Sequence, residues 1–332
     1  MAIDVVPFSD SDDVAVRHSW RINTAAARAR TPDLPDRTWD YHLNAVRNPF
    51  PHHRFERALA HLDGTSVGCA EIGMPLRDNL DNATVEIFVH PAHRRRGAGR
   101  ALHAWAVDRV HRHGRKRLTG ETVQTAAADD AFAVAMGATA ALAETRSRLD
   151  VPAADTGRLD AMLAEAWTRA AGYRFVAWDG VPPEQWIDDV AYLDGRLLSD
   201  APMGDLEWEP EAVDADRIRQ AEERHATLGV DRICGGIEHV ASGRLVAFTV
   251  LAGVPAIPEH LWQNITLVDP PHRGHRLGLV VKLENLRHAL RHRPGLRAVD
   301  TFNASSNEHM LAINVAMGFR PVDRWMQWQQ TV

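Results

Sequence analysis

Residues 89–100 read VHPAHRRRGAGR and join a strand-like segment to a helix-like one. Apolar residues alternate along Ala83–Val89, as in a half-buried strand, and recur at helical spacing from about Gly97 to His113. The glycines let the backbone approach a ligand closely, and the unpaired N–H groups of a helix's first turn attract negative charge. Together with the arginines, this strand–loop–helix unit predicts a phosphate-binding site.

Two common phosphate-binding motifs do not fit this stretch. A dinucleotide fingerprint needs Gly or Ala at position 102, which is Leu102, and a shorter loop than the one between Val89 and Gly97. A Walker loop needs Lys followed by Ser or Thr after its second glycine, whereas Gly99 is followed by Arg and Ala. The loop therefore belongs to another class of phosphate site.

The chain repeats this stretch. Residues 268–279 read VDPPHRGHRLGL and keep the Pro, His, Arg and final Gly of the first loop, 179 residues later. Further on, Val134–Gly137 (VAMG) recurs letter for letter as Val315–Gly318. Matches in the same order at nearly constant offset indicate a duplicated unit.

Each copy shows the same order of elements around its loop. Strands are expected at 55–61, 67–73, 83–89, 116–123, 142–151, 244–251, 264–268 and 296–303. Helices are expected at 14–30, 38–47, 97–113, 129–136, 211–225, 279–291 and 307–317. Pro152 to Gly157 is the expected linker.

The pattern Val-x-Pro-x-x-Arg-x-x-Gly-x-Gly at 89–99 resembles the acyl-CoA loop of the GNAT acetyltransferase superfamily. The tandem arrangement is similar to that of mycothiol synthase and related actinobacterial acetyltransferases. The resemblance implies an α/β fold of two tandem GNAT-like domains, each a mixed, mostly antiparallel sheet flanked by helices. The expected domains are residues 1–152, which bind CoA, and residues 153–332, with a degenerate cofactor loop.

The resemblance also implies how acetyl-CoA is bound. The backbone amides from Arg95 to Arg100 would wrap its pyrophosphate, and Phe88 and Val89 would hydrogen-bond its pantetheine arm, the Val89 amide polarising the thioester carbonyl. The complete set of expected cofactor-binding residues is Phe88, Val89, Arg94, Arg95, Arg96, Gly97, Ala98, Gly99 and Arg100.

The second copy departs from the pattern. Arg276 stands where the first loop has Gly97, and a side chain there is expected to crowd a pyrophosphate. The second copy does keep Asn307, at the place where the superfamily has an Asn that contacts the CoA arm. Seven residues after it the superfamily often has a Tyr that protonates the thiolate, but this chain has Asn314.

The first copy has alanine at both of these places, Ala126 and Ala133. The three tyrosines, Tyr41, Tyr173 and Tyr192, lie elsewhere, so a tyrosine acid is not expected in either copy. A thiolate whose pKa is near 8.5 can leave with help from water.

Glu86 is the candidate catalytic base. It lies on the strand before the loop, while Val85, Ile87 and Val89 alternate to the opposite face. A partly desolvated carboxylate has a raised pKa, suited to taking a proton from an ammonium group. Glu71, on the neighbouring strand, is the second choice, and the second copy has Ile265 at the place of Glu86.

Composition and residue spacing limit the kinds of partner and ligand that this protein is expected to bind. The net charge of -6 and the isoelectric point near 6.3 disfavour a nucleic-acid or anionic-membrane binder. Cys69 and Cys234 make no ligand spacing, no metal site is expected, and His288 and His292 are taken as a surface pair. Without a leader or membrane segment, we expect a cytoplasmic protein, monomeric through an intramolecular pseudo-dimer.

Three functional hypotheses follow. The first is an enzyme that transfers an acetyl or short acyl group from acyl-CoA to the amine of a small molecule, using the first copy. The second is a noncatalytic CoA-binding or interaction protein, suggested by the missing tyrosines. The third places catalysis in the second copy, with Asn307.

Overall fold

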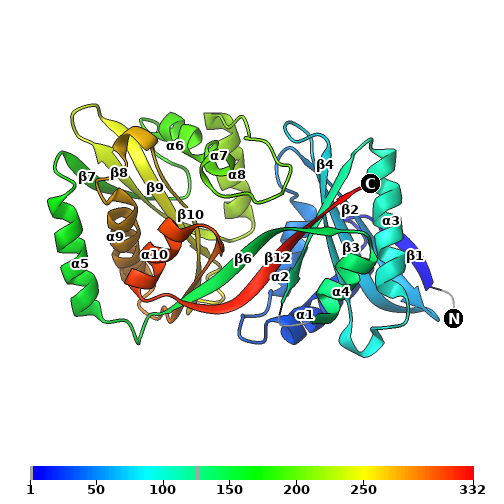
Figure 1. The fold of residues 1–332 in the computed structure, drawn as a ribbon. Helices are drawn as coiled ribbons and strands as arrows, with labels where there is room; N and C mark the ends of the chain where they lie inside the picture. Colours follow the sequence, from blue (N-terminus) through cyan, green and yellow to red (C-terminus); the bar gives the residue numbers. More distant parts are fainter. Residues whose placement is uncertain (1–2, 125–126) are drawn as a thin grey trace. The chain divides into compact units, whose positions relative to one another are not determined.

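The computed structural model describes residues 3–124 and 127–332, which divide into two compact units. Unit 1 comprises Met1–Ala143, Gly204–Trp208 and Arg324–Val332, and unit 2 comprises Glu144–Met203 and Glu209–Asp323. Figure 1 labels their helices and strands. Each unit contains mixed, mostly antiparallel strands flanked by helices, so the predicted α/β fold class is confirmed.

Unit 1 is built around strands in the order β1-β2-β3-β4-β5-β12. Its elements are β1 (Ile3–Phe8), α1 (Asp13–Arg30), α2 (Trp39–Arg47), β2 (His53–Leu62), β3 (Thr65–Pro75), β4 (Asn82–Val89), the 3-10 turn η1 (Pro91–His93), α3 (Ala98–Arg112), β5 (Arg117–Val123) and α4 (Ala127–Ala135). Helix α3 packs on one face of this sheet, where Leu102, Ala106 and Val110 are buried, and α1 packs on the other.

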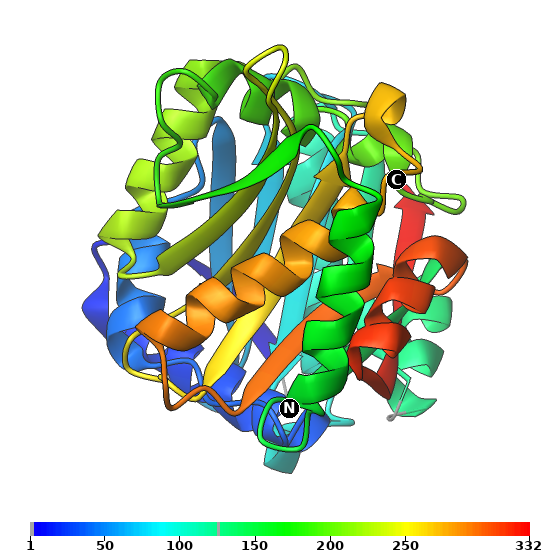
Figure 2. The same cartoon turned by 90° about the vertical axis from the view of Figure 1, so that its left-hand side faces the viewer.

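Unit 2 repeats the arrangement in the order β6-β11-β10-β9-β8-β7. Its elements are α5 (Thr156–Thr168), β7 (Tyr173–Asp179), α6 (Ile187–Asp194), α7 (Leu197–Asp200), α8 (Ala215–Thr227), β8 (Asp231–His239), β9 (Arg244–Gly253), β10 (His260–Val268), the 3-10 turn η2 (Pro270–His272), α9 (Leu277–His292), β11 (Ala298–Ala304) and α10 (Glu308–Met317). Figure 2 shows α9 lying across the sheet with α5 beside it, and these two helices are in contact.

Two long strands, β6 (Thr139–Asp150) and β12 (Arg320–Thr331), decide where the units divide. Residues 144–150 of β6 pair with β11 of unit 2, and residues 325–331 of β12 pair with β5 of unit 1. Each copy thus gives part of its last strand to the sheet of the other. A single cut between residues 152 and 153, expected from the sequence, does not separate the two compact units for this reason.

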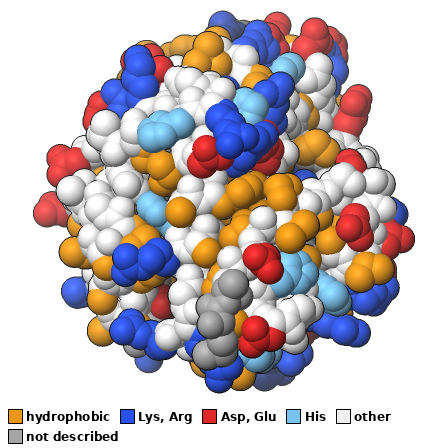
Figure 3. Space-filling model, turned by 90° about the vertical axis from the view of Figure 1, so that its right-hand side faces the viewer, with side chains coloured by type: hydrophobic (Ala, Val, Ile, Leu, Met, Phe, Trp, Pro, Cys, Tyr) orange, Lys and Arg blue, Asp and Glu red, His pale blue; other side chains and the backbone are white. Residues whose placement is uncertain are grey.

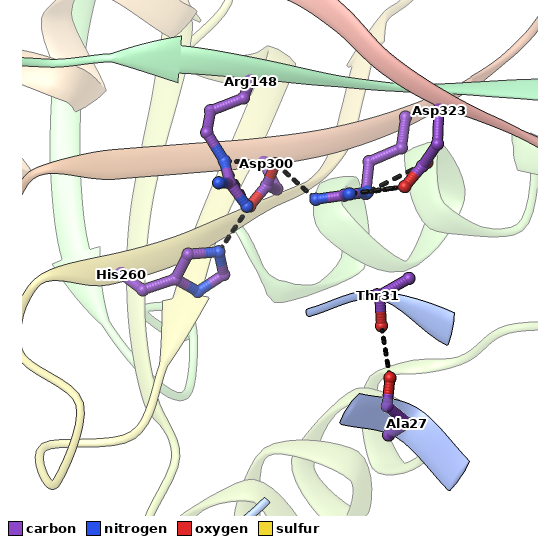
Figure 4. A network of polar contacts seen from close by, with 7 residues as sticks. Ala27, Thr31, Arg148, His260, Asp300 and Asp323 are labelled. Atoms are coloured by element: carbon purple, nitrogen blue, oxygen red, sulfur yellow. Dashed lines mark hydrogen bonds and ion pairs between the residues drawn. The ribbon is translucent and has the colours of Figure 1, made fainter. Parts of the chain in front are cut away.

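A buried ionic network holds β6 in unit 2. Figure 4 shows Asp300 of β11 between Arg148 of β6 and His260 of β10. Arg146, fully buried on β6, pairs with both Asp300 and Asp323. Burial alone would raise the pKa of Asp300, but the hydrogen bonds from His260 and Arg148 outweigh it and hold that pKa below its ordinary value.

Most expected elements are present within a few residues of their expected bounds, but β1, β7, β8, β12, α5, α6 and α7 were not predicted. The β8 segment hides its strand pattern behind Gly235 and Gly236. Close packing requires glycine at both positions. A Cβ on Gly235 would lie 2.9 Å from Asn285 Cβ, and a Cβ on Gly236 would lie 2.5 Å from Leu245 Cδ1. The close approach of neighbouring side chains, rather than strand propensity, explains why glycines occur at these positions of β8.

Candidate functional site

The basic loop of unit 1 joins β4 to α3. Gly97 is the N-cap of α3, with φ of +95°, and Arg95 also has a positive φ of +63°. The helix has no side-chain cap, so the N–H groups of its first turn stay available. The loop therefore presents backbone donors and the positive end of a helix dipole, a suitable arrangement for an anion.

The charged side chains around the loop also favour binding of an anion. Its four arginines are exposed, and among the described residues none has an acidic partner; they are Arg94, Arg95, Arg96 and Arg100. Arg94 Nε donates to the Val89 carbonyl oxygen at 3.4 Å, which leaves its charge without an acidic partner among the described residues. This concentration of unneutralised positive charge favours a polyanionic ligand.

The loop of unit 2 has nearly the same backbone but a different charge balance. Gly274 and Arg276 have positive φ values of +85° and +59° at the places of Arg95 and Gly97. Arg273 Nη2 lies 2.8 Å from Asp200 Oδ2, and the Arg276 guanidinium lies 3.6 Å from Glu165 Oε1. Both arginines are thus partly neutralised by acidic side chains of their own unit.

The crowding expected of Arg276 concerns a bound pyrophosphate and stays a prediction. A Cβ on Gly97 would meet nothing nearer than Ile3 Cγ1, at 3.9 Å, and the Arg276 side chain reaches toward Glu165. Charge pairing is an observed difference between the two loops.

Gly99 has a packing role in the structure. A Cβ there would lie 3.2 Å from the Phe132 ring of α4 and 3.8 Å from Val89 Cγ2. Ala98, beside it, is buried in the α3-side core. These two small residues let the first turn of α3 pack closely, and they hold the loop in place.

Strand β4 separates from β5 just before the loop. The two strands pair in parallel only over Asn82–Thr84 and Arg117–Thr119, whereas β4 stays paired with β3 up to Val89. Val89 packs on the α3 side of the sheet and Phe88 on the α1 side. Among the described residues, the β5-facing edge of the last residues of β4 therefore has no strand partner, as an added pseudo-strand would require.

Glu86 lies in this diverging part of β4, on the same face as Phe88. The residue keeps solvent-accessible surface, although protein atoms surround the carboxyl group closely enough to desolvate it. Desolvation is the largest influence and raises the pKa of Glu86 above its ordinary value. Arg37 and Arg30 oppose the rise, and Glu71 adds to it.

Further polar side chains lie in this region of unit 1, and of those described next the sequence had suggested Glu71. Glu71 is the direct cross-strand partner of Glu86 and receives a 2.5 Å hydrogen bond from Arg57 Nε. His42 of α2 is buried and donates to Ser19 Oγ, 3.0 Å away, because that hydroxyl donates to the Val16 carbonyl. Burial, together with Arg37 and Arg57, lowers the pKa of His42 to about 4, so this imidazole is neutral at physiological pH.

The places expected to hold a thiolate acid contain no tyrosine. Asn307 caps α10, its side-chain oxygen accepting from the Met310 N–H at 3.2 Å. Asn314 accepts from the buried Lys282 Nζ at 2.8 Å and donates to Asn303. Ala133 lies in α4, and Ala126 lies outside the described residues.

One group of possible metal ligands lies in unit 2. Asp179, His288 and His292 bring ligand atoms within 4.8 Å of one another. Arg291 donates to His288 Nδ1 at 3.3 Å, so in neutral His288 the proton is on Nε2, the atom that faces Asp179 at 4.0 Å. A proton rather than a lone pair on that atom does not favour a metal, and we assign none.

One face of the molecule shows how charged and hydrophobic side chains are distributed on its surface. Figure 3 views the side on which α3 and β1 lie in Figure 1, and acidic, basic, histidine and hydrophobic side chains are mixed on this face. Such a mixed face lacks the extended basic surface that binds a nucleic-acid backbone. Among the described residues, no helix is long and apolar enough to cross a membrane.

Comparisons with known proteins agree with this geometry. Residues 19–137 match the family model described as the acetyltransferase (GNAT) family. A mycothiol acetyltransferase of Saccharomonospora viridis is 28% identical over 262 residues, which cover 76% of this chain and 76% of that protein.

Solved structures extend the likeness to both units. A tandem GNAT protein from the clavulanic acid biosynthesis pathway superposes with a TM-score of 0.82 and 28% identity, covering 99% of this chain and 98% of that one. A GCN5-related N-acetyltransferase from Sphaerobacter thermophilus has a TM-score of 0.66 and 14% identity over 99% and 95% of the two chains, which supports the fold alone. Residues 19–137 therefore match the GNAT acetyltransferase family, and the chain as a whole is similar to a tandem GNAT protein.

Proposed function

We propose that this protein transfers an acetyl or other short acyl group from acyl-CoA to the amine of a small molecule, and that unit 1 carries the reaction. The observation that carries the proposal is the position of Glu86. An accessible carboxylate with a raised pKa lies on β4, the strand that leads directly into the loop with four unneutralised arginines. A base and a phosphate-binding loop on one short segment suit an amine acceptor and a CoA donor.

The loop would hold the donor. The backbone N–H groups from Arg95 to Arg100 would bind the pyrophosphate, with Arg94 and its neighbours neutralising its charge. The unpaired edge of β4 at Phe88 and Val89 would hydrogen-bond the pantetheine arm. The Val89 N–H would polarise the thioester carbonyl as negative charge develops on its oxygen.

Glu86 would accept a proton from the ammonium group of the acceptor, directly or through one water molecule. The neutral amine nitrogen then attacks the thioester carbonyl carbon, a C–N bond forms and the C–S bond breaks. The attacking nitrogen loses its second proton to water as the C–S bond breaks, and the departing CoA thiolate takes a proton from water, since no tyrosine stands at the expected place for an acid. Glu86 then releases its proton to solvent, so that one proton is released in all. Products are an amide and free CoA.

The experiment is an acyl-transfer assay on the purified full-length chain. Acetyl-CoA is incubated with a panel of polyamines, amino acids and aminoglycosides, and products are detected by mass spectrometry together with released CoA thiol. We expect at least one amine to gain an acetyl group in proportion to enzyme. Binding of acetyl-CoA by calorimetry without transfer to any amine would instead support the noncatalytic CoA-binding hypothesis.

A further inference from the structure

Arg30 is the last residue of α1, and its guanidinium is largely buried, with 14% of the side chain exposed. Two of its nitrogen atoms, Nε and Nη2, are buried and have no hydrogen-bond partner among the residues that the structure describes. These atoms lie on one edge of the planar guanidinium, the edge that can grip both oxygens of a carboxylate.

The surroundings of Arg30 place it in the candidate site of unit 1. Its guanidinium lies 5.7 Å from the ring centre of Phe88 and 5.2 Å from that of Trp325. It also acts electrostatically on Glu86, the proposed base. A ligand held by Arg30 would therefore lie near the strand that carries Glu86.

A purely structural role accounts for only part of this arrangement. The nearest acidic group is Asp129 of α4, whose Oδ2 lies 4.0 Å from Arg30 Nε, beyond hydrogen-bond distance. The two rings stabilise the positive charge but accept no N–H in the plane of the guanidinium. Leaving buried donors unmet is unfavourable, so the geometry calls for an acceptor that the described protein does not supply.

We propose that Arg30 binds a carboxylate of the substrate, so that the enzyme handles acyl transfer in which one reactant carries a carboxylate group. This rests on the function proposed above. The carboxylate belongs either to the acceptor, as in an amino acid, or to a dicarboxylic acyl group, as in succinyl-CoA. In both cases the two oxygens meet Nε and Nη2, as in bidentate arginine–carboxylate pairs.

The test compares matched probes that differ in the carboxylate. Succinyl-CoA is paired with butyryl-CoA, and amino acids are paired with their amides in the presence of CoA, with dissociation constants measured by calorimetry. We expect the carboxylated member of one pair to bind wild type about tenfold to a hundredfold more tightly than its partner. The pair that shows this preference identifies the source of the carboxylate.

Two variants assign the preference to Arg30. Arg30→Gln should abolish it while leaving acetyl-CoA affinity within about twofold. The matched control is Arg28→Gln, on the same helix, whose guanidinium is exposed and already paired with Asp36; it should leave the preference intact. Thermal melts of both variants report whether unit 1 stays folded.

Asp129→Asn separates a ligand site from a structural ion pair. If Arg30 awaits a ligand, this variant should bind the carboxylated probe more tightly, since a competing charge is removed. If Arg30 and Asp129 only stabilise the fold, each single variant lowers the melting temperature and the double variant lowers it no further.

Equal binding of both members of each pair, unchanged by Arg30→Gln, would overturn the inference. That failure is distinct from failure of the proposed function. A protein that acetylates uncharged amines without any carboxylate preference keeps the function and loses only the role of Arg30. A protein that binds no acyl-CoA loses the function itself.

Discussion

One face of the sheet lies under α1 in unit 1, and the equivalent face lies under α6 in unit 2. The side chains on these two faces differ in kind. Cross-strand register makes the two faces comparable, because Phe88 opposite Cys69 in unit 1 corresponds to Leu267 opposite Phe248 in unit 2. Three positions carry the contrast: Cys69, Glu71 and Glu86 in unit 1, and Phe248, Val250 and Ile265 in unit 2.

The difference separates a face that carries two carboxylates from one that is apolar at the same positions. In unit 2 these positions pack with Trp178, Trp186 and the apolar side of α6 in one hydrophobic cluster. In unit 1 two carboxylates stand side by side on neighbouring strands, an arrangement that destabilises the fold. Such a local cost is typical of a functional site and is offset by packing elsewhere.

The largest effect is expected at Glu86. Glu86→Gln keeps the size of the side chain but cannot accept the proton, so turnover should fall by about two to four orders of magnitude with little change in acetyl-CoA affinity. Ile265→Leu, at the equivalent place in unit 2, is the matched control and should leave turnover within about twofold. Steady-state kinetics with a responsive amine measures both, and near-normal turnover of the Glu86 variant would remove this residue from the mechanism.

The pH dependence gives a second view of the same residue. The pKa of Glu86 is raised in the folded protein, so ionisation of this carboxyl reduces stability as pH rises through that folded value. Glu86→Gln should therefore melt at a higher temperature than wild type at neutral pH. The gain should disappear in acid, below the ordinary glutamate pKa of about 4.3. A variant less stable than wild type at neutral pH would contradict a desolvated carboxylate.

The unit 2 cluster should respond in stability and not in activity. Phe248→Ala leaves a cavity among large buried side chains, and we expect it to reduce the free energy of unfolding by about 3–5 kcal/mol. Cys69→Ala, the equivalent change in unit 1, removes far less buried surface and should cost much less. Hydrogen exchange of β9 and β3 peptides assigns each loss to its unit, and equal losses would show that the two faces are packed alike.

A smaller effect concerns Lys282, which is fully buried in α9 at the place of His103 in α3. Burial lowers its pKa to about 7, so the unfolded chain holds the lysine proton more strongly than the folded one does. Stability of unit 2 should then rise with pH from about 7 toward the ordinary lysine value near 10.4, by at most about 1.4 kcal/mol per pH unit.

Lys282→Met should flatten this rise. Lys116→Met, in which the replaced lysine is exposed and paired with Asp81, should keep it. Unfolding midpoints between neutral and alkaline pH measure both slopes, and a slope that survives in the Lys282 variant would assign it to another group.

Sequence patterns predicted the local features of the site well. Three such features depend only on neighbours in the chain, and all three are present. They are the loop, the helix that follows it, and the alternation that puts Glu86 on the face of the sheet opposite to that of Val85 and Ile87. The repeat also aligned the loops correctly, since the positive φ values recur 179 residues apart.

Features that depend on distant residues were not predictable. The exchange of the last strands follows from pairing between β12 and β5, far apart in the chain, and no local signal specifies it. The pairing of Arg273 with Asp200, and the gathering of Arg30 near Phe88, likewise exist only once the helices have packed.

The central claim is that a single acyl-CoA site lies in unit 1. Calorimetric titration with acetyl-CoA tests it on wild type and on two paired variants, Arg95→Gln with Arg96→Gln in the unit 1 loop and Arg273→Gln with Arg276→Gln in the unit 2 loop. We expect a stoichiometry near one, lost or weakened at least about tenfold by the unit 1 change and unaffected by the unit 2 change. Two equal sites in wild type, or binding lost only through the unit 2 loop, would contradict the claim.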